Sequence, residues 1–156
     1  MITFLEFVYF IFFLIWVILF LIYIYKSLRK QYDFKYIIIA LLFFIINIFI
    51  DSKLSNLVIN EINSEISNST KIIFIDNNKN RIEIDKNSSE LKINTTSQKH
   101  SEKKVENSLL IFPTNTRVIL REDSKSKSKF WIKYSKYYFS NIKAVGYLEI
   151  NSKYIL

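Results

Sequence analysis

The sequence predicts a membrane protein of the α+β class, in which a transmembrane hairpin of two helices precedes a small antiparallel β-barrel. Three observations favour this class. Nearly all of residues 1–50 is apolar, whereas the remainder is rich in Lys, Asn, Ser and Ile. The apolar part holds two long runs separated by a basic loop. Short β-branched segments then follow one another, without helical periodicity after about Asn68.

The first apolar run, from Phe7 to Tyr25, contains no charged residue. At a rise of about 1.5 Å per residue, such a run crosses a hydrocarbon core of roughly 30 Å. We therefore expect a transmembrane helix over about residues 4–25. A signal peptide is the alternative, but no basic segment precedes the run and no small-residue cleavage site follows it.

The second run, from Tyr36 to Ile50, is shorter and contains Asn47. We expect a helix over residues 34–50 that gains length because Lys35 snorkels toward the headgroups. The amide of Asn47 is suited to bonding across to the first helix. A buried helix of a soluble protein is the alternative interpretation of this run.

The loop of residues 26–35 carries Lys26, Arg29, Lys30 and Lys35 against a single acid, Asp33. The positive-inside rule places such a loop in the cytoplasm. The sequence thus predicts a multi-pass protein of the cytoplasmic (inner) membrane, with the lipid bilayer as its first partner. Both termini, and the C-terminal domain, are expected outside the cytoplasm.

Residues 51–67 have apolar side chains at helical spacing, namely Leu54, Leu57, Val58, Ile62 and Ile66. We expect an amphipathic helix that continues the second span as a juxtamembrane stalk. Pairing with a second copy through this stripe, which would make a homo-oligomer, is the alternative.

Residues 68–156 are predicted to form a β-rich domain. A hairpin is expected at KIIFID and RIEID around an Asn-rich turn, and further strands at LKIN, SLLIF, TRVIL, FWIKY and AVGYLEI. Closure of these strands into a barrel would remove exposed strand edges.

Residues 91–156 also carry motifs in the order of a known family. These are Leu91-Lys92-Ile93, Asn115-Thr116-Arg117-Val118, Trp131-Ile132-Lys133-Tyr134, Gly146-Tyr147-Leu148 and Tyr154-Ile155-Leu156. In this order and spacing the segment resembles a bacterial SH3 domain, although Tyr147 stands where the family has Trp. The resemblance implies an SH3-like barrel, with Asn115 at a turn of positive φ and the only glycine, Gly146, where backbones approach closely. Two spans followed by one such domain are also similar to the C-terminal part of Bat-type aerotolerance membrane proteins.

The composition argues against catalysis. The chain has no cysteine, one histidine (His100) and one glycine, so thiolate chemistry and glycine-rich phosphate loops are excluded. Glu83, Asp85 and Glu90 form no recognisable catalytic pair. Asp76, Asn78 and Asn80 resemble the start of a calcium loop, but the required Gly and Glu are replaced by Arg81 and Asn87. We expect no enzyme activity, no metal and no cofactor.

The segment KSKSKFWIKYSKYYFSNIK interleaves aromatic residues with lysines and contains no acid. Aromatic faces stack on flat groups while ammonium groups hold anions. The candidate ligand-binding residues are Trp131, Lys133, Tyr134, Tyr137, Tyr138 and Tyr147. The alternative is that Trp131 and about half of these aromatics belong to the core. In the predicted compartment the available anions are lipid headgroups and wall polymers, not nucleic acid.

These features together predict a non-enzymatic, membrane-anchored module that binds an envelope protein or polymer. A membrane-disrupting effector, whose cytoplasmic barrel senses a nucleotide signal, is the main alternative. A passive subunit of a larger membrane complex is a third.

Overall fold

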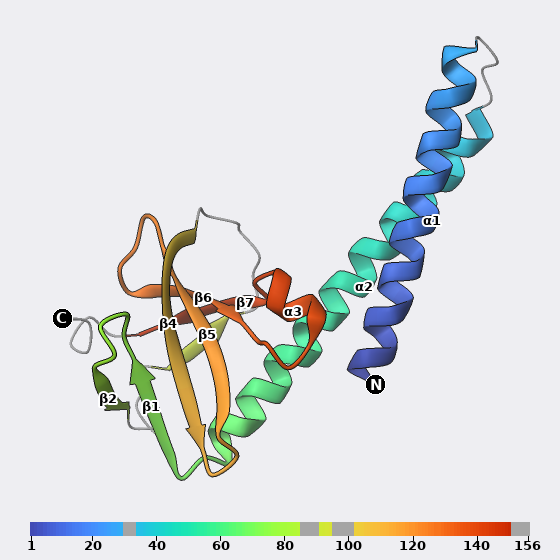
Figure 1. The fold of residues 1–156 in the computed structure, drawn as a ribbon. Helices are drawn as coiled ribbons and strands as arrows, with labels where there is room; N and C mark the ends of the chain where they lie inside the picture. The colour runs from blue at the N-terminus through green and yellow to red at the C-terminus, as the bar shows by residue number, and fades with distance from the viewer. Residues whose placement is uncertain (30–33, 85–90, 95–101, 151–156) are drawn as a thin grey trace. The chain divides into compact units, whose positions relative to one another are not determined.

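A computed structural model describes residues 1–29, 34–84, 91–94 and 102–150 (Figure 1). The chain divides into two compact units, residues 1–54 and residues 55–156. The division falls within the second long helix, so this helix contributes its first part to one unit and its last part to the other.

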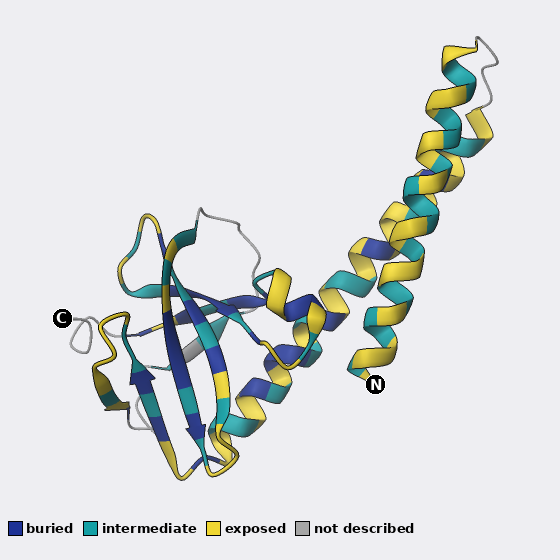
Figure 2. Ribbon diagram, viewed as in Figure 1, coloured by how far each residue is buried: buried dark blue, intermediate teal, exposed yellow. Residues whose placement is uncertain are grey.

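The first unit consists of helix α1 (Ile2–Leu28) and the first part of helix α2 (Phe34–Ser67). Both helices are long and apolar enough to cross a membrane, with mean hydropathies of 2.9 and 2.3 in their most apolar windows. No residue of α1 is buried, as its teal and yellow ribbon shows (Figure 2). The helices extend beyond the expected residues 4–25 and 34–50, and α2 runs without interruption to Ser67.

Polar and aromatic contacts join the two helices of this unit. Ala40, Asn47 and Leu54 are the buried residues on the α2 side of this unit. With its amide turned to suit its neighbours, Asn47 lies 3.2 Å from the carbonyl oxygen of Tyr9 and 3.2 Å from the amide nitrogen of Phe13. Aromatic rings meet nearby, at 5.2 Å between Phe12 and Phe43. Asn47 therefore occupies the position expected of a polar bond across to α1.

The second unit is built around an antiparallel sheet of seven strands in the order β2-β1-β4-β5-β6-β7-β3. Its strands are β1 (Lys71–Ile75), β2 (Arg81–Ile84), β3 (Lys92–Asn94), β4 (Glu102–Phe112), β5 (Thr116–Asp123), β6 (Lys129–Lys133) and β7 (Gly146–Glu149). A short helix, α3 (Tyr138–Ile142), lies between β6 and β7. Each expected strand is present. Strand β4 begins earlier than predicted, at Glu102, and α3 was not foreseen from the helical period because it is only one turn long.

The sheet is strongly curled. Phe74 on β1 and Phe130 on β6 are separated by two strands, yet their ring centroids are 5.6 Å apart. In a flat sheet, three strand spacings of about 4.8 Å would hold them much farther apart. A register shift between Glu102 and Glu106 of β4 contributes to the bend. Among the described residues β2 and β3 are edge strands, so the sheet forms a half-barrel rather than the closed barrel that the sequence predicts.

One face of this half-barrel forms the hydrophobic core. Alternate residues of neighbouring strands face the same side, and cross-strand pairs such as Leu109 with Val118 and Phe130 with Leu148 are buried together. Val58, Ile59 and Ile62 of α2 are at most 1% exposed. Residues 55–67 therefore belong to the same compact unit as the sheet. The sequence pattern instead predicts a juxtamembrane stalk for this segment.

Two described residues with positive φ shape turns of the sheet. Asn115, between β4 and β5, has a φ of 55°, as the sequence predicts. In the β1–β2 turn the positive φ falls on Lys79 (65°) rather than on an asparagine. There the carboxylate of Asp76 accepts bonds of 2.8 Å from the backbone and the side chain of Asn80, which closes the turn.

Gly146 opens β7 without a positive φ. A Cβ at this position would lie 2.5 Å from the carbonyl oxygen of Asn94 on β3 and 2.7 Å from Cδ1 of Ile59 on α2. The glycine is therefore required by close approach, as predicted, and the crowding comes from a strand and a helix that meet at this point.

Candidate interaction site

The six predicted ligand-binding residues do not form one site. Trp131, Lys133 and Tyr147 lie on the side of β6 and β7 opposite the core residues Phe130 and Leu148, because side chains alternate along a strand. Tyr134 and Tyr137 follow β6 and lie beside α2, and Tyr138 lies on α3. The basic and aromatic segment thus supplies three separate environments.

The first environment is an aromatic pair on β6 and β7. Trp131 and Tyr147 meet edge to face with centroids 5.9 Å apart, and Lys129 lies over both rings, 5.0 Å from Trp131 and 3.8 Å from Tyr147. The indole nitrogen of Trp131 donates to the buried carboxylate of Asp123 at 2.9 Å. Trp131 is only 3% exposed, so this pair is mostly structural, and Lys129 already occupies its cation-binding face.

Lys133 takes part in a charged network on the same side of the sheet. Its ammonium group donates to the carbonyl oxygen of Ile142 at 3.2 Å and lies 3.5 Å from Glu102. Arg121 joins Glu102 and Glu106 in this network. The lysine holds the C-terminal end of α3 against β6, a positioning role that its side-chain exposure of 12% supports.

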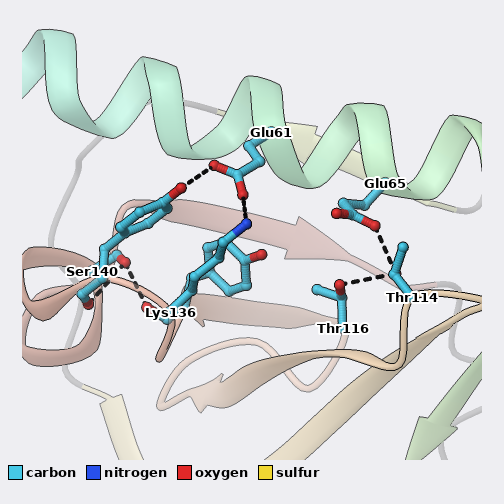
Figure 3. Close-up of polar contacts among 8 residues, drawn as sticks. Glu61, Glu65, Thr114, Thr116, Lys136 and Ser140 are labelled. Atoms are coloured by element: carbon cyan, nitrogen blue, oxygen red, sulfur yellow. Dashed lines mark hydrogen bonds and ion pairs between the residues drawn. The ribbon is translucent and has the colours of Figure 1, made fainter. Parts of the chain in front are cut away.

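The second environment joins the loop after β6 to α2 (Figure 3). One carboxylate oxygen of Glu61 accepts a bond from the ammonium group of Lys136, and the other accepts a 2.6 Å bond from the hydroxyl of Tyr137. Ser140 closes the loop from within, because its hydroxyl donates to the carbonyl of Tyr134 at 2.5 Å. We call Glu61, Lys136 and Tyr137 the latch.

The electrostatics of the latch follow from these bonds. Burial alone would raise the pKa of Glu61, but the bonds from Lys136 and Tyr137 outweigh it, so this pKa is lowered. The bond to Glu61 raises the pKa of Lys136. Burial, together with donation to the Glu61 carboxylate, raises the pKa of Tyr137 to about 12. At neutral pH the latch is therefore a carboxylate held by an ammonium group and a neutral phenol.

An open depression of about 420 Å³ lies beside the latch. Its lining includes Glu65, Thr114, Thr116, Arg117, Tyr134 and Lys136. Thr114 donates to Glu65 at 2.7 Å and contacts Thr116 at 2.9 Å (Figure 3). These three side chains of the depression are therefore already hydrogen-bonded to one another. The depression is shallow and mixed in charge, which suits a polar contact rather than an enclosed small molecule.

The third environment is the outer face of α3. Phe139 points into the core at 7% exposure, whereas Tyr138 and Ile142 are 72% and 59% exposed. These two residues are spaced i and i+4, so they share one face of the helix turn. Among described residues after Phe49, no other large hydrophobic side chain is as exposed. Tyr138 belongs to the predicted set, but Ile142 does not, because a single isoleucine in an Ile-rich sequence carries no distinguishing signal.

Glu61 and Asp123 are also absent from the candidate residues chosen from the sequence. Glu61 looks like one polar residue on the solvent side of an amphipathic helix, and its partners lie 75 and 76 residues away. Asp123 ends β5 at the start of a basic loop, with no pattern that pairs it with Trp131. Both are positioned by tertiary structure that a single sequence does not show.

The described part of the chain holds no cluster of metal ligands. No three His, Cys, Asp or Glu side chains there come together as metal ligands. Glu83 is exposed and pairs with Lys71 at 2.6 Å. His100, Asp85 and Glu90 lie outside the described residues, as do Tyr154, Ile155 and Leu156.

Neither a family model nor a curated protein or solved structure matches this chain.

Proposed function

We propose that this chain is a non-enzymatic, two-span membrane protein that displays its β unit outside the cytoplasmic membrane as an interaction module for an envelope protein or polymer. The observation that most directly supports this proposal is the apolar, exposed surface of α1. It is a helix of 27 residues with a mean hydropathy of 2.9 and no buried residue. Exposed apolar surface on this scale is costly in water and favourable in lipid.

The ends of the hairpin support the orientation. Lys26 and Lys35 both lie over the ring of Tyr36, at 4.5 and 5.4 Å, and Arg29 lies over Tyr25 at 4.7 Å. Cations and tyrosines combined in this way are typical of the membrane interface. The excess of positive charge in this loop favours a cytoplasmic location, which places residues 55–156 on the opposite side of the membrane.

The β unit supports binding rather than catalysis. Its described polar surface includes paired charges, the latch and a shallow depression, and these features suit contacts with a polar macromolecule. Four of the five motifs of the SH3-like resemblance fall on β3, the turn before β5, β6 and β7, whereas Tyr154-Ile155-Leu156 lies outside the described residues. This family remains our proposal for the fold. A wall polymer or envelope peptide is the corresponding class of partner.

Two measurements test this proposal. The chain should stay in the pellet when membranes are washed with alkaline carbonate, because its spans are held by lipid. Alkaline phosphatase fused after Leu156 should be active, and a fluorescent protein that folds only in the cytoplasm should be dark at the same position. Extraction by carbonate would refute the membrane anchor.

An inactive phosphatase fusion with a bright cytoplasmic reporter would refute the orientation. In that case the nucleotide-sensing effector becomes the better hypothesis. It would be examined by binding of cyclic dinucleotides to the purified full chain and by toxicity on overexpression.

A further inference from the structure

The exposed face of α3 has no occupant within the described structure. Tyr138 and Ile142 project from one face of a helix turn whose opposite side is fixed by buried Phe139 and Ser140. The turn is further held at its C-terminal end by Lys133, which donates to the carbonyl of Ile142. The two apolar side chains are thus presented on a helical turn whose other side is packed into the core.

The chain segment that carries this face is basic. Between Ser124 and Leu148 the chain contains six lysines and no acid. Lys136 and Lys143 flank α3 on either side, and Lys143 lies 5.7 Å from the ring of Phe139. Acids of other elements approach this segment at several points: Glu61 on α2 is bound to Lys136, Glu65 on α2 lines the depression that Lys136 also lines, and Glu102 on β4 lies beside Lys133. An apolar pair within a basic segment is the combination that anionic lipid surfaces attract.

We propose that Tyr138 and Ile142 insert into the headgroup region of an anionic bilayer and dock the β unit on the membrane surface. This inference rests on the proposed membrane anchor. The second apolar run ends at Ile50 and the β unit begins at Ser55, so the unit is tethered close to a bilayer by the sequence itself. Tethering makes a weak contact intramolecular, and effective concentrations in the millimolar range are then typical.

A second copy of the chain is a poorer occupant of this face. Stable protein interfaces bury on the order of 800 Å² on each partner. Two side chains of one helix turn provide only a small part of such an area. Tyrosine is moreover enriched at membrane interfaces, where its ring enters the acyl boundary and its hydroxyl stays hydrated.

The test uses the full chain, which contains no cysteine, so a single introduced thiol is labelled uniquely. Ile142→Cys carries an environment-sensitive NBD dye in proteoliposomes of phosphatidylcholine and phosphatidylglycerol. The matched control is Asn78→Cys, at the exposed tip of the β1–β2 turn. We expect the NBD emission at residue 142 to be blue-shifted, and nitroxide-labelled lipids to quench it several-fold more strongly than at residue 78.

Three companion samples separate the contributions. Adding Tyr138→Ser to the Ile142→Cys chain should reduce the quenching, and so should vesicles of phosphatidylcholine alone or a rise in salt. Equal quenching at residues 142 and 78 would overturn the docking. Disulfide cross-linking between two Ile142→Cys chains, in place of lipid quenching, would also overturn it and identify a second copy as the occupant.

Carbonate extraction of the same proteoliposomes keeps the two proposals apart. A chain that resists extraction but shows no quenching at residue 142 retains its membrane anchor and loses only the α3 contact. A chain that carbonate releases overturns both proposals.

Discussion

At the scale of single residues, Gly146, the only glycine of the chain, lies where packing leaves no room for a side chain. Its backbone runs between the carbonyl oxygen of Asn94 and the side chain of Ile59, and a methyl group would lie within 2.7 Å of both. The carbonyl belongs to a paired strand and has little freedom to move. We therefore expect Gly146→Ala to destabilise the β unit by about 1–3 kcal/mol, the range typical of overpacking.

This destabilisation is measurable by urea unfolding of the full chain in detergent. Trp131 reports on the β unit once Trp16 is replaced by Phe, because Trp16 lies in α1. Asn60→Ala, at an exposed position of α2, is the matched control and should change the free energy of unfolding little. Equal stability of the Gly146→Ala and unmodified chains would show that the strand and helix move apart at no cost.

At the scale of elements, the last part of α2 serves as a core helix of the β unit. Ile62 is 0% exposed, and its neighbour Ile59 touches the position of Gly146. We expect Ile62→Ala to cost about 2–5 kcal/mol, because it removes buried methyl groups and leaves a cavity. The same fluorescence-detected urea titration measures this loss. A loss that grew on dilution of the protein would instead mean that the stripe pairs two copies.

The latch couples this helix to the loop after β6 in a pH-dependent way. The folded-state pKa of Glu61 is lowered, so its stabilisation is present above the unfolded pKa of about 4.3 and disappears as the pH falls through the lower folded value. We expect Glu61→Gln to destabilise the unit by about 1–3 kcal/mol at pH 7. The difference between the two chains should shrink as the pH is lowered toward 3.

Urea titrations at several pH values measure this difference directly. Glu149→Gln is a suitable control, because Glu149 is exposed on β7 and lies on the opposite side of the sheet from α2. A difference that stayed constant between pH 7 and pH 3 would contradict the assigned role of the Glu61 charge.

Local patterns predicted the elements well, because alternation and helical spacing depend on neighbouring residues alone. The strands around Ile72, Val118 and Trp131, the continuation of α2 to Ser67 and the turn at Asn115 were all within reach of such patterns. What escaped was set by distant partners. In the described part of the chain β2 and β3 remain edge strands, and Glu61 meets Lys136 across 75 residues. Neither the open edges nor this long-range bond can be recognised from a local pattern in a single sequence.

At the scale of the whole molecule, the distribution of apolar surface distinguishes the two units. In residues 1–54, large hydrophobic side chains are exposed along both helices, whereas the described residues of the second unit bury theirs except on α3 (Figure 2). A soluble fold would bury the first set against other elements. In the proposed anchoring of α1 and α2 and the proposed docking of α3, the membrane would be the solvent of one unit and a neighbouring surface for the other.

The orientation of such a protein depends on few charges, and this gives a last prediction. Topology follows the excess of Lys and Arg near the ends of the spans, and acidic residues contribute little. The nearest cation in the sequence on the other side of the hairpin is Lys53. Replacing Lys26, Arg29, Lys30 and Lys35 by Gln, while changing Thr3 and Ser52 to Lys, should therefore invert the hairpin. Phosphatase activity after Leu156 would fall and cytoplasmic reporter fluorescence would rise.

The Thr3 and Ser52 changes alone, with the loop intact, should leave the orientation largely unchanged. If the reporters did not respond to the combined change, the folded β unit rather than the loop charge would have to determine the orientation.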